Sequence, residues 1–241
     1  MMARQIVDAA LAAARSEPRI GPHFRPARLD LDDEGVLTIE GDVKSVAQKR
    51  LVLERLAATP GVVGIIDRMH VTPAAPMSDS GILDHLRRRF SQEPAFRNLA
   101  IAERSGGRLE LVRAAEDSAA GEIDLAVEDG VVTLDGAAPS LASKRLAGVM
   151  TWWTPGVRDV VNGMAVEPPE EDGPIAIEEA VKLALEKDPF VDADQIRVGV
   201  RGASVRLTGL VKSDGMRETA EADAWYVFGV DDVINQIEVR A

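Results

Sequence analysis

"LTIEGDVKS" at residues 37–45, "VTLDGAAPS" at 132–140 and "VRLTGLVKS" at 205–213 share one pattern: alternating apolar residues, a glycine, and a serine four residues later. Apolar residues at every second position are typical of a strand with one buried face. A serine hydroxyl can accept a hydrogen bond from the free amides of a first helical turn. Each stretch therefore predicts a strand that ends near the glycine and a helix that begins at the serine.

The spacing after the glycine is also the same in all three places. A second glycine follows 20 residues after the first, and a valine follows ten residues after that. The three sets are Gly41, Gly61 and Val71; Gly136, Gly156 and Val166; and Gly209, Gly229 and Val239. A fixed period of this kind predicts three copies of one structural unit. We expect the six glycines to lie where the backbone needs conformational freedom or close approach.

The elements of one unit can be predicted from the residues before and after these markers. A second short strand precedes each stretch, as "RLDL" at 28–31, "IDLAV" at 123–127 and "IRVGV" at 196–200, and a tight turn joins the two strands into a hairpin. Apolar residues at helical spacing precede the hairpins at 6–14, 82–90 and 175–185. The predicted fold class is α+β, with three αββαβ units, each a three-stranded mixed sheet covered on one face by two helices.

This order of elements, together with the glycine and valine skeleton, resembles the BON domain family of bacterial envelope and stress proteins. The resemblance covers three modules, at residues 1–74, 75–168 and 169–241. It implies a non-catalytic protein that binds a phospholipid membrane surface or a protein partner in an envelope, stress or osmotic stress context. Potassium binding is associated with at least one cytoplasmic member, so the resemblance also implies an alternative function as a soluble potassium-binding or potassium-sensing protein.

The second copy is longer than the others. Gly136 follows Phe96 by 40 residues, whereas Gly41 follows Phe24 by only 17, which places an insertion around residues 98–121. Within it, "IAER" and "RLELV" flank a Ser-Gly-Gly turn, a pattern that favours an additional hairpin. A segment of this length is also compatible with a functional or disordered loop, and the sequence leaves the alternatives open.

Composition excludes several classes of function. The formal net charge of −12 disfavours nucleic acid as a partner, and the absence of cysteine rules out disulfides, a thiolate nucleophile and a sulfur-ligated zinc. The acidic stretch with Asp188, Asp192 and Asp194 lacks the spacing of a calcium loop, and no phosphate-binding loop or nucleophile elbow is present. We predict no enzyme activity, no cofactor and no metal site.

Arginines 87–89, in "HLRRRF", are the first candidates for binding. They fan over one predicted helix, which makes them suited either to phosphate headgroups or to a solvated helix face that softens an acidic domain. The net charge is 0 for residues 1–74, −4 for 75–168 and −8 for 169–241, so the first two copies are the better candidates for contact with an anionic surface.

Four aromatic residues form the second group of candidates. Trp152 and Trp225 occupy equivalent positions in copies two and three, and so do Trp153 and Tyr226. Helical geometry turns Trp153 and Tyr226 away from their own cores. They are expected either to pack against a neighbouring copy or to form a patch for a partner or a membrane interface.

The N-terminal stretch indicates in which cellular compartment the protein is expected. Asp8 interrupts its only apolar run, so it does not resemble a signal peptide, and no stretch approaches the length needed to cross a bilayer. The chain as it stands predicts a cytoplasmic protein, and an upstream signal sequence would change that prediction to the periplasm. The sequence does not predict an oligomeric state.

Overall fold

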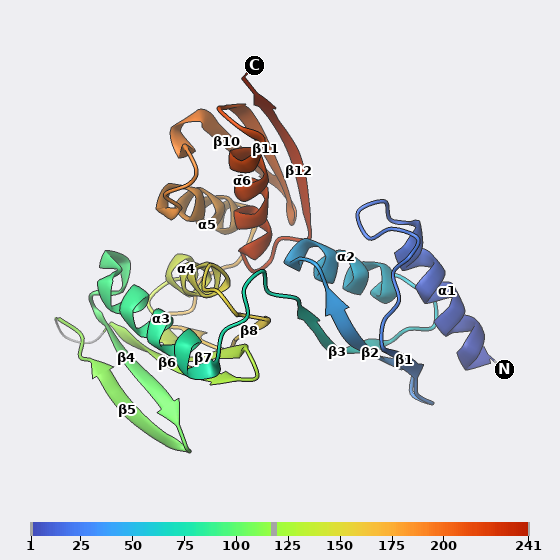
Figure 1. Ribbon diagram of the computed structural model, residues 1–241, viewed down its shortest axis with the longest axis horizontal. Coiled ribbons are helices and arrows are strands. Elements are labelled where there is room, and N and C mark those ends of the chain that lie inside the picture. The colour runs from blue at the N-terminus through green and yellow to red at the C-terminus, as the bar shows by residue number, and fades with distance from the viewer. Residues whose placement is uncertain (1, 117–119, 241) are drawn as a thin grey trace. The chain divides into compact units, whose positions relative to one another are not determined.

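The computed structural model describes residues 2–116 and 120–240, and the chain divides into two compact units, Met1–Thr72 and Pro73–Ala241. The first unit contains one αββαβ module, and the second contains two. Figure 1 shows the three successive sets of helices and strands along the colour gradient from the N-terminus to the C-terminus.

The first module consists of α1 (Met2–Ser16), β1 (Arg28–Leu31), β2 (Val36–Val43), α2 (Val46–Ala57) and β3 (Gly64–Val71). β2 is the central strand, antiparallel to β1 and parallel to β3. The alternating residues Leu37 and Ile39 of β2 are buried, as are Leu51 and Leu56 of α2. The apolar alternation thus places one face of the sheet under the helices.

The third module repeats this arrangement with α5 (Pro174–Lys187), the short helix η2 (Ala193–Gln195), β10 (Ile196–Arg201), β11 (Ser204–Val211), α6 (Asp214–Tyr226) and β12 (Asp232–Val239). Its sheet has the order β10-β11-β12, again antiparallel and then parallel. Val205 and Leu207 are buried in the same way as Leu37 and Ile39.

The middle module contains more strands than the three expected. Its sheet has six strands, with the order β5-β4-β6-β7-β8 and with β9 paired to β7. The elements are α3 (Asp79–Gln92), η1 (Pro94–Phe96), β4 (Leu99–Ser105), β5 (Arg108–Arg113), β6 (Gly121–Glu128), β7 (Val131–Ala138), α4 (Leu141–Trp152), β8 (Asp159–Asn162) and β9 (Ala165–Val166).

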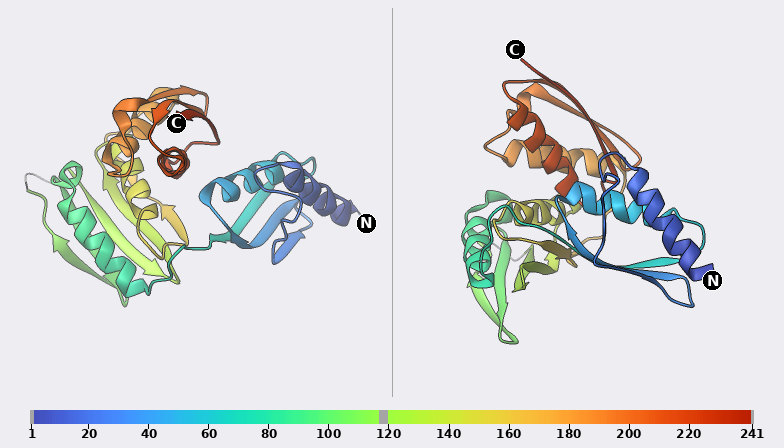
Figure 2. Two further views of the ribbon diagram at one scale, coloured as in Figure 1. Left: turned by 45° about the horizontal axis from the view of Figure 1, so that its top comes forward. Right: turned by 45° about the vertical axis from the view of Figure 1, so that its right-hand side comes forward.

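Two differences account for the larger sheet. β4 and β5 form an antiparallel hairpin inside the 98–121 segment, and β4 pairs in parallel with β6. The counterparts of β6 in the other two modules, β1 and β10, are edge strands. The last strand is divided in two around Gly163, and both parts pair with β7. Residues 117–119 of the insertion lie outside the described residues. Figure 2 shows α3 lying across one face of this sheet and the β4–β5 hairpin extending it.

The α+β class and the three αββαβ repeats are confirmed, and so are the predicted helix starts. Ser45, Ser140 and Ser213 are the N-caps of α2, α4 and α6, and each hydroxyl accepts a hydrogen bond from the backbone N–H three residues later. The same capping interaction therefore begins the second helix of every module.

The six glycines of the repeat all have positive φ. The reason is clearest at Gly136 and Gly209, where the backbones of paired strands approach closely. A Cβ at Gly136 would overlap the carbonyl oxygen of Glu122, and a Cβ at Gly209 would overlap that of Gln195. In both places glycine provides a backbone conformation and a space that other residues do not.

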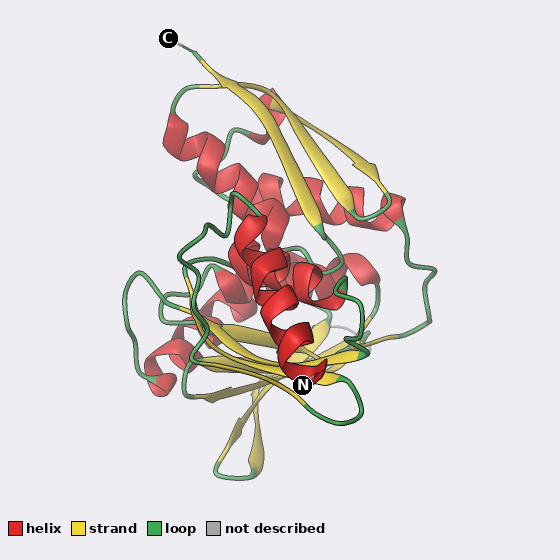
Figure 3. Cartoon of the chain, turned by 90° about the vertical axis from the view of Figure 1, so that its right-hand side faces the viewer, coloured by secondary structure: helices red, strands yellow, loops and turns green. Residues whose placement is uncertain are grey.

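The two modules of the second unit pack through their helices. α4 contacts both α5 and α6 (Figure 1), and Figure 3 shows the helices of the chain in red and its strands in yellow from another side. The buried Arg145 of α4 joins them: its Nε donates to the carbonyl oxygen of Phe228, and its Nη2 donates to both carboxylate oxygens of Asp172, at 2.8 and 2.9 Å. This junction is where the candidate site lies.

Candidate functional site

Three of the four candidate aromatic residues lie at the contact between α4 and α6. The rings of Trp152 and Tyr226 are stacked, with centroids 5.9 Å apart and an interplanar angle of 14°. Trp153 donates a hydrogen bond from Nε1 to Oδ1 of Asp223, at 2.7 Å. All three aromatic side chains are half-buried, so they link the second and third modules.

Trp225, the fourth candidate for membrane or partner binding, lies in the core. Only 1% of its area is exposed, because it lies on the side of α6 that packs into the interior with Ala220 and Ala224. A partner cannot contact its ring in this structure. The binding assignment of Trp225 is therefore corrected to a core position.

The three candidate arginines of α3 point to different surroundings. Arg87 lies 3.5 Å from Asp84 and 3.4 Å from Glu103, so carboxylates already neutralise it. Arg88 donates from Nε to the carbonyl oxygen of Asp84 at 3.3 Å, and Arg89 donates from Nη1 to that of Met150 at 3.4 Å. Among residues 2–116 and 120–240, neither Arg88 nor Arg89 has a carboxylate within ion-pair distance.

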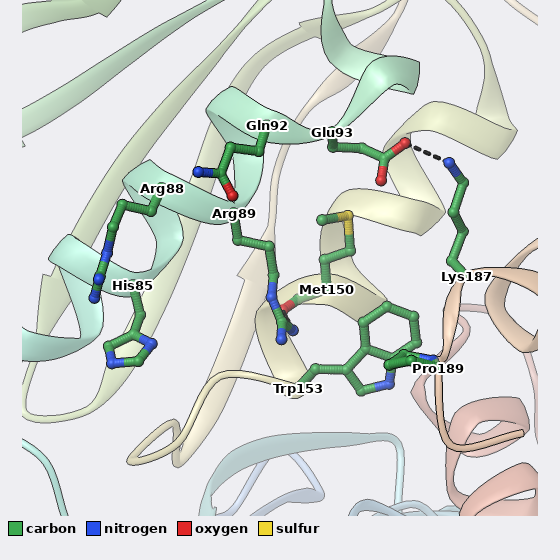
Figure 4. A pocket seen from close by; sticks show the side chains of 9 residues that line it. All are labelled: His85, Arg88, Arg89, Gln92, Glu93, Met150, Trp153, Lys187 and Pro189. Carbon is green, nitrogen blue, oxygen red and sulfur yellow. Dashed lines mark hydrogen bonds and ion pairs between the residues drawn. The ribbon is translucent and has the colours of Figure 1, made fainter.

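Arg88 and Arg89 line a pocket of about 460 Å³ between α3, the end of α4 and the end of α5 (Figure 4). Its lining residues are His85, Arg88, Arg89, Gln92, Glu93, Met150, Trp153, Lys187 and Pro189. The Lys187 ammonium and the Glu93 carboxylate form an ion pair of 2.6 Å at one side. Since that pair is neutral, the two arginines give the pocket a net positive charge.

Arg89 occupies the boundary between the pocket and the module junction. Its guanidinium lies 5.7 Å from the centre of the Trp153 ring, a cation–π arrangement. Partial loss of hydration lowers the pKa of Arg89, while the nearby Asp188 opposes that change. An arginine remains protonated in proteins, so the effect is a cation that has lost part of its water and can gain from a new anionic contact.

Two carboxyl groups of the third module are buried, and one of them accepts the hydrogen bond from Trp153. Asp223 of α6 is 1% exposed, and Asp188, which follows α5, is 6% exposed. The pKa of Asp223 is raised to about 8, mainly by burial; the hydrogen bond from Trp153 opposes this rise, and the nearby Asp188 contributes to it. Desolvation and these two carboxylates also raise the pKa of Tyr226.

Sequence reasoning identified part of this arrangement and missed the rest. It singled out Arg88, Arg89 and Trp153, which the structure brings to one pocket, and Arg87, which points elsewhere. It assigned no role to Asp223 or Lys187, and it considered Asp188 only as a cation ligand. Asp223 lies 14 residues after Gly209, where the other copies have Arg55 and Met150, so an acidic residue at that repeat position was the available signal.

The described residues offer neither a metal site nor a membrane-spanning helix. Within residues 2–116 and 120–240, no three histidine, aspartate or glutamate side chains are grouped so that they could hold a metal ion. None of the helices in this part of the chain has the length and apolar character needed to cross a bilayer.

Comparison with known proteins gives one family. The BON domain model matches residues 4–73, 108–168 and 176–241. The second match begins inside the 98–121 segment, after α3 and β4. No curated protein matches the chain.

Solved structures of CdsD, a structural protein of the type III secretion system of Chlamydia trachomatis, also align with the chain. A structure of its C-terminal domain has 13% identity and a TM-score of 0.25, and covers 98% of both chains. A second CdsD structure has the same identity and TM-score, and covers 95% of this chain and 91% of the other. These TM-scores are too low to support a conclusion about fold or function.

Proposed function

Because this chain belongs to the BON domain family, matched in three regions that cover most of its length, we propose that it is a non-catalytic binding protein whose partner carries negatively charged groups. The favoured partner is an anionic phospholipid surface, in the envelope or stress context that the family suggests. An acidic protein surface is the other partner of the same chemistry.

One observation carries this proposal: the pocket holds two arginines without carboxylate partners among the described residues, although the chain as a whole is strongly acidic. A guanidinium matches the geometry of a phosphate and forms charge-assisted hydrogen bonds with it. Trp153 and Met150 supply apolar surface beside the arginines. This combination of cations and apolar groups suits the boundary between phosphate headgroups and acyl chains.

The matched control for Arg88 is Arg197, an exposed arginine on β10 of the third sheet. In a flotation experiment, the full chain is mixed with vesicles of phosphatidylcholine alone or with phosphatidylglycerol added. We expect binding to the anionic vesicles only, with a loss of several-fold as salt screens the interaction. Arg88→Glu should reduce binding by about ten-fold or more, and Arg197→Glu should change it little.

Equal binding to neutral vesicles, or equal losses in the two variants, would contradict the pocket as the binding site. A potassium-dependent rise in melting temperature without vesicle binding would instead favour the alternative function, a potassium-binding or potassium-sensing protein.

A further inference from the structure

The two buried carboxyl groups of the third module have too few hydrogen-bond donors for two negative charges. Asp223 receives one bond at Oδ1, from Trp153, and its buried Oδ2 has no donor among the described residues. Asp188 accepts a bond at Oδ1 from the backbone N–H of Phe190, at 2.7 Å. A carboxyl group that is buried to this degree and receives a single hydrogen bond is expected to retain its proton, so Asp223 is the group expected to be neutral.

The charged and titratable groups near these two carboxyls come from α3, α6 and the end of α5, while the end of α4 contributes the neutral indole of Trp153. α3 contributes Arg89, and α6 contributes Tyr226 beside Asp223. The end of α5 contributes Lys187, which is paired with Glu93 and lies next to Asp188 in sequence. Arg89 is therefore the cation that lies near Asp188, packs over the Trp153 ring bonded to Asp223, and also lines the pocket.

We propose that anion binding in the pocket is linked to a proton held by the buried Asp223, so that loss of this proton weakens binding. This inference rests on the proposed function, because it concerns the regulation of the same site. With the proton in place, Arg89 is opposed by one negative charge and remains available to the ligand. Without it, a second negative charge near Trp153 attracts Arg89 and repels an anion in the pocket.

The buried carboxyl group of Asp223 determines how the binding affinity changes with pH and over which pH range it changes. The pKa of Asp223, raised to about 8 by burial, places loss of the proton between about pH 7 and pH 9. Binding should then be strongest at neutral or mildly acidic pH and should fall as the pH rises through this range. His85 also lines the pocket, so a His85 variant serves as a control for the pocket lining.

The experiment measures flotation of the full chain with phosphatidylglycerol vesicles at constant ionic strength, from pH 6.5 to pH 9. A phosphodiester keeps its charge over this range, so the probe itself does not titrate. We expect affinity to fall by roughly three- to ten-fold, which is the size expected of one added charge near a partly solvated site. Asp223→Asn should bind with an affinity that is independent of pH. The control Asp231→Asn removes an exposed carboxylate and should keep the full dependence.

The possible outcomes distinguish the proposed pH linkage from the proposed anion-binding function. Binding of equal strength at every pH would overturn the linkage and leave the proposed function intact. An identical fall in Asp223→Asn, or loss of the fall in His85→Gln, would assign the dependence to another group and also overturn the linkage. Absence of binding at any pH would overturn the proposed function and the linkage with it. Circular dichroism of each variant across the pH range verifies that all remain folded. If Asp223→Asn does not fold, Asp223→Glu replaces it as the test: this variant keeps a carboxyl group and should retain the pH dependence of binding.

Discussion

Asp223 links the second and third modules, and its buried carboxyl group at the same time reduces the stability of the fold. A carboxyl group buried at a helix contact is held neutral, because its ionised form would lose hydration without gaining a cation. Its hydrogen bond from Trp153 connects α6 to α4. The residue therefore links two modules and makes the strength of that link depend on pH.

The pH dependence of stability is the first consequence at this scale. The pKa of Asp223 is raised from 3.8 to about 8 in the folded state, so the folded protein binds more protons than the unfolded chain between these values. The free energy of unfolding should fall as the pH rises through this window and should become constant above it. Relative to the natural chain, Asp223→Asn should gain melting temperature between pH 5 and pH 9. Parallel melting temperatures in the two proteins would contradict the assignment, and Asp231→Asn provides the matched loss of an exposed carboxylate.

At the scale of elements, the local patterns could be predicted and the contacts between modules could not. The caps at Ser45, Ser140 and Ser213 and the alternating strands depend on residues within a few positions of one another, so the sequence contains the necessary information. The same holds for the hairpin strands that begin at Arg28 and Ile196.

The helix faces that point away from their own core have surroundings that depend instead on which element of a neighbouring module covers them. Helical geometry turned Trp153 and Tyr226 from their own cores, but it did not tell that α4 and α6 face one another. Trp225 was a binding candidate as the equivalent of Trp152, but a position 100° from the core face still leaves its ring within reach of the interior, where it is buried. Asp223 had no predicted role, because an acidic residue at a repeat position where the other copies have Arg55 and Met150 marks a difference between copies without showing that the carboxyl group is buried.

The contact between α4 and α6 gives a prediction for the aromatic residues. The double replacement of Trp153 and Tyr226 by alanine removes the stacked pair and the bond to Asp223, so it should lower the free energy of unfolding by about 3 kcal/mol or more. The control replaces Phe190 and Phe228, which are 74% and 62% exposed, by alanine and should cost less than about 1 kcal/mol. Urea unfolding measures both. A stable double variant that loses its partner would instead favour a binding patch at Trp153 and Tyr226.

At the scale of the whole molecule, the three modules have different degrees of independence. The first forms a compact unit by itself, whereas the second and third share Arg145, the stacked aromatic residues and the bond between Trp153 and Asp223. We propose residues 1–74, 75–168 and 169–241 as the module boundaries. The stability of the third module should therefore depend on the second.

Fragments test this difference. Residues 169–241 alone should melt at a lower temperature than the same module within residues 75–241, because α6 loses the contacts that α4 supplies. Trp225 is the only tryptophan of the 169–241 fragment, so its fluorescence reports the core of that module. Residues 1–74 alone should melt at the temperature they show in the full chain. Far-ultraviolet circular dichroism can follow the unfolding of this fragment. Equal melting temperatures for the third module in both contexts would contradict a shared junction.

The β4–β5 hairpin has a consequence for how the chain reaches its structure. Tandem copies with the same strand pattern can exchange strands during folding, because each copy offers an edge that accepts the strand of another. β4 occupies the edge of β6 in parallel register, so the middle copy does not offer the edge that β1 and β10 leave open in the other copies. The insertion thus makes the middle copy unlike its neighbours at the position where mispairing would begin, which favours correct pairing as the chain emerges from the ribosome.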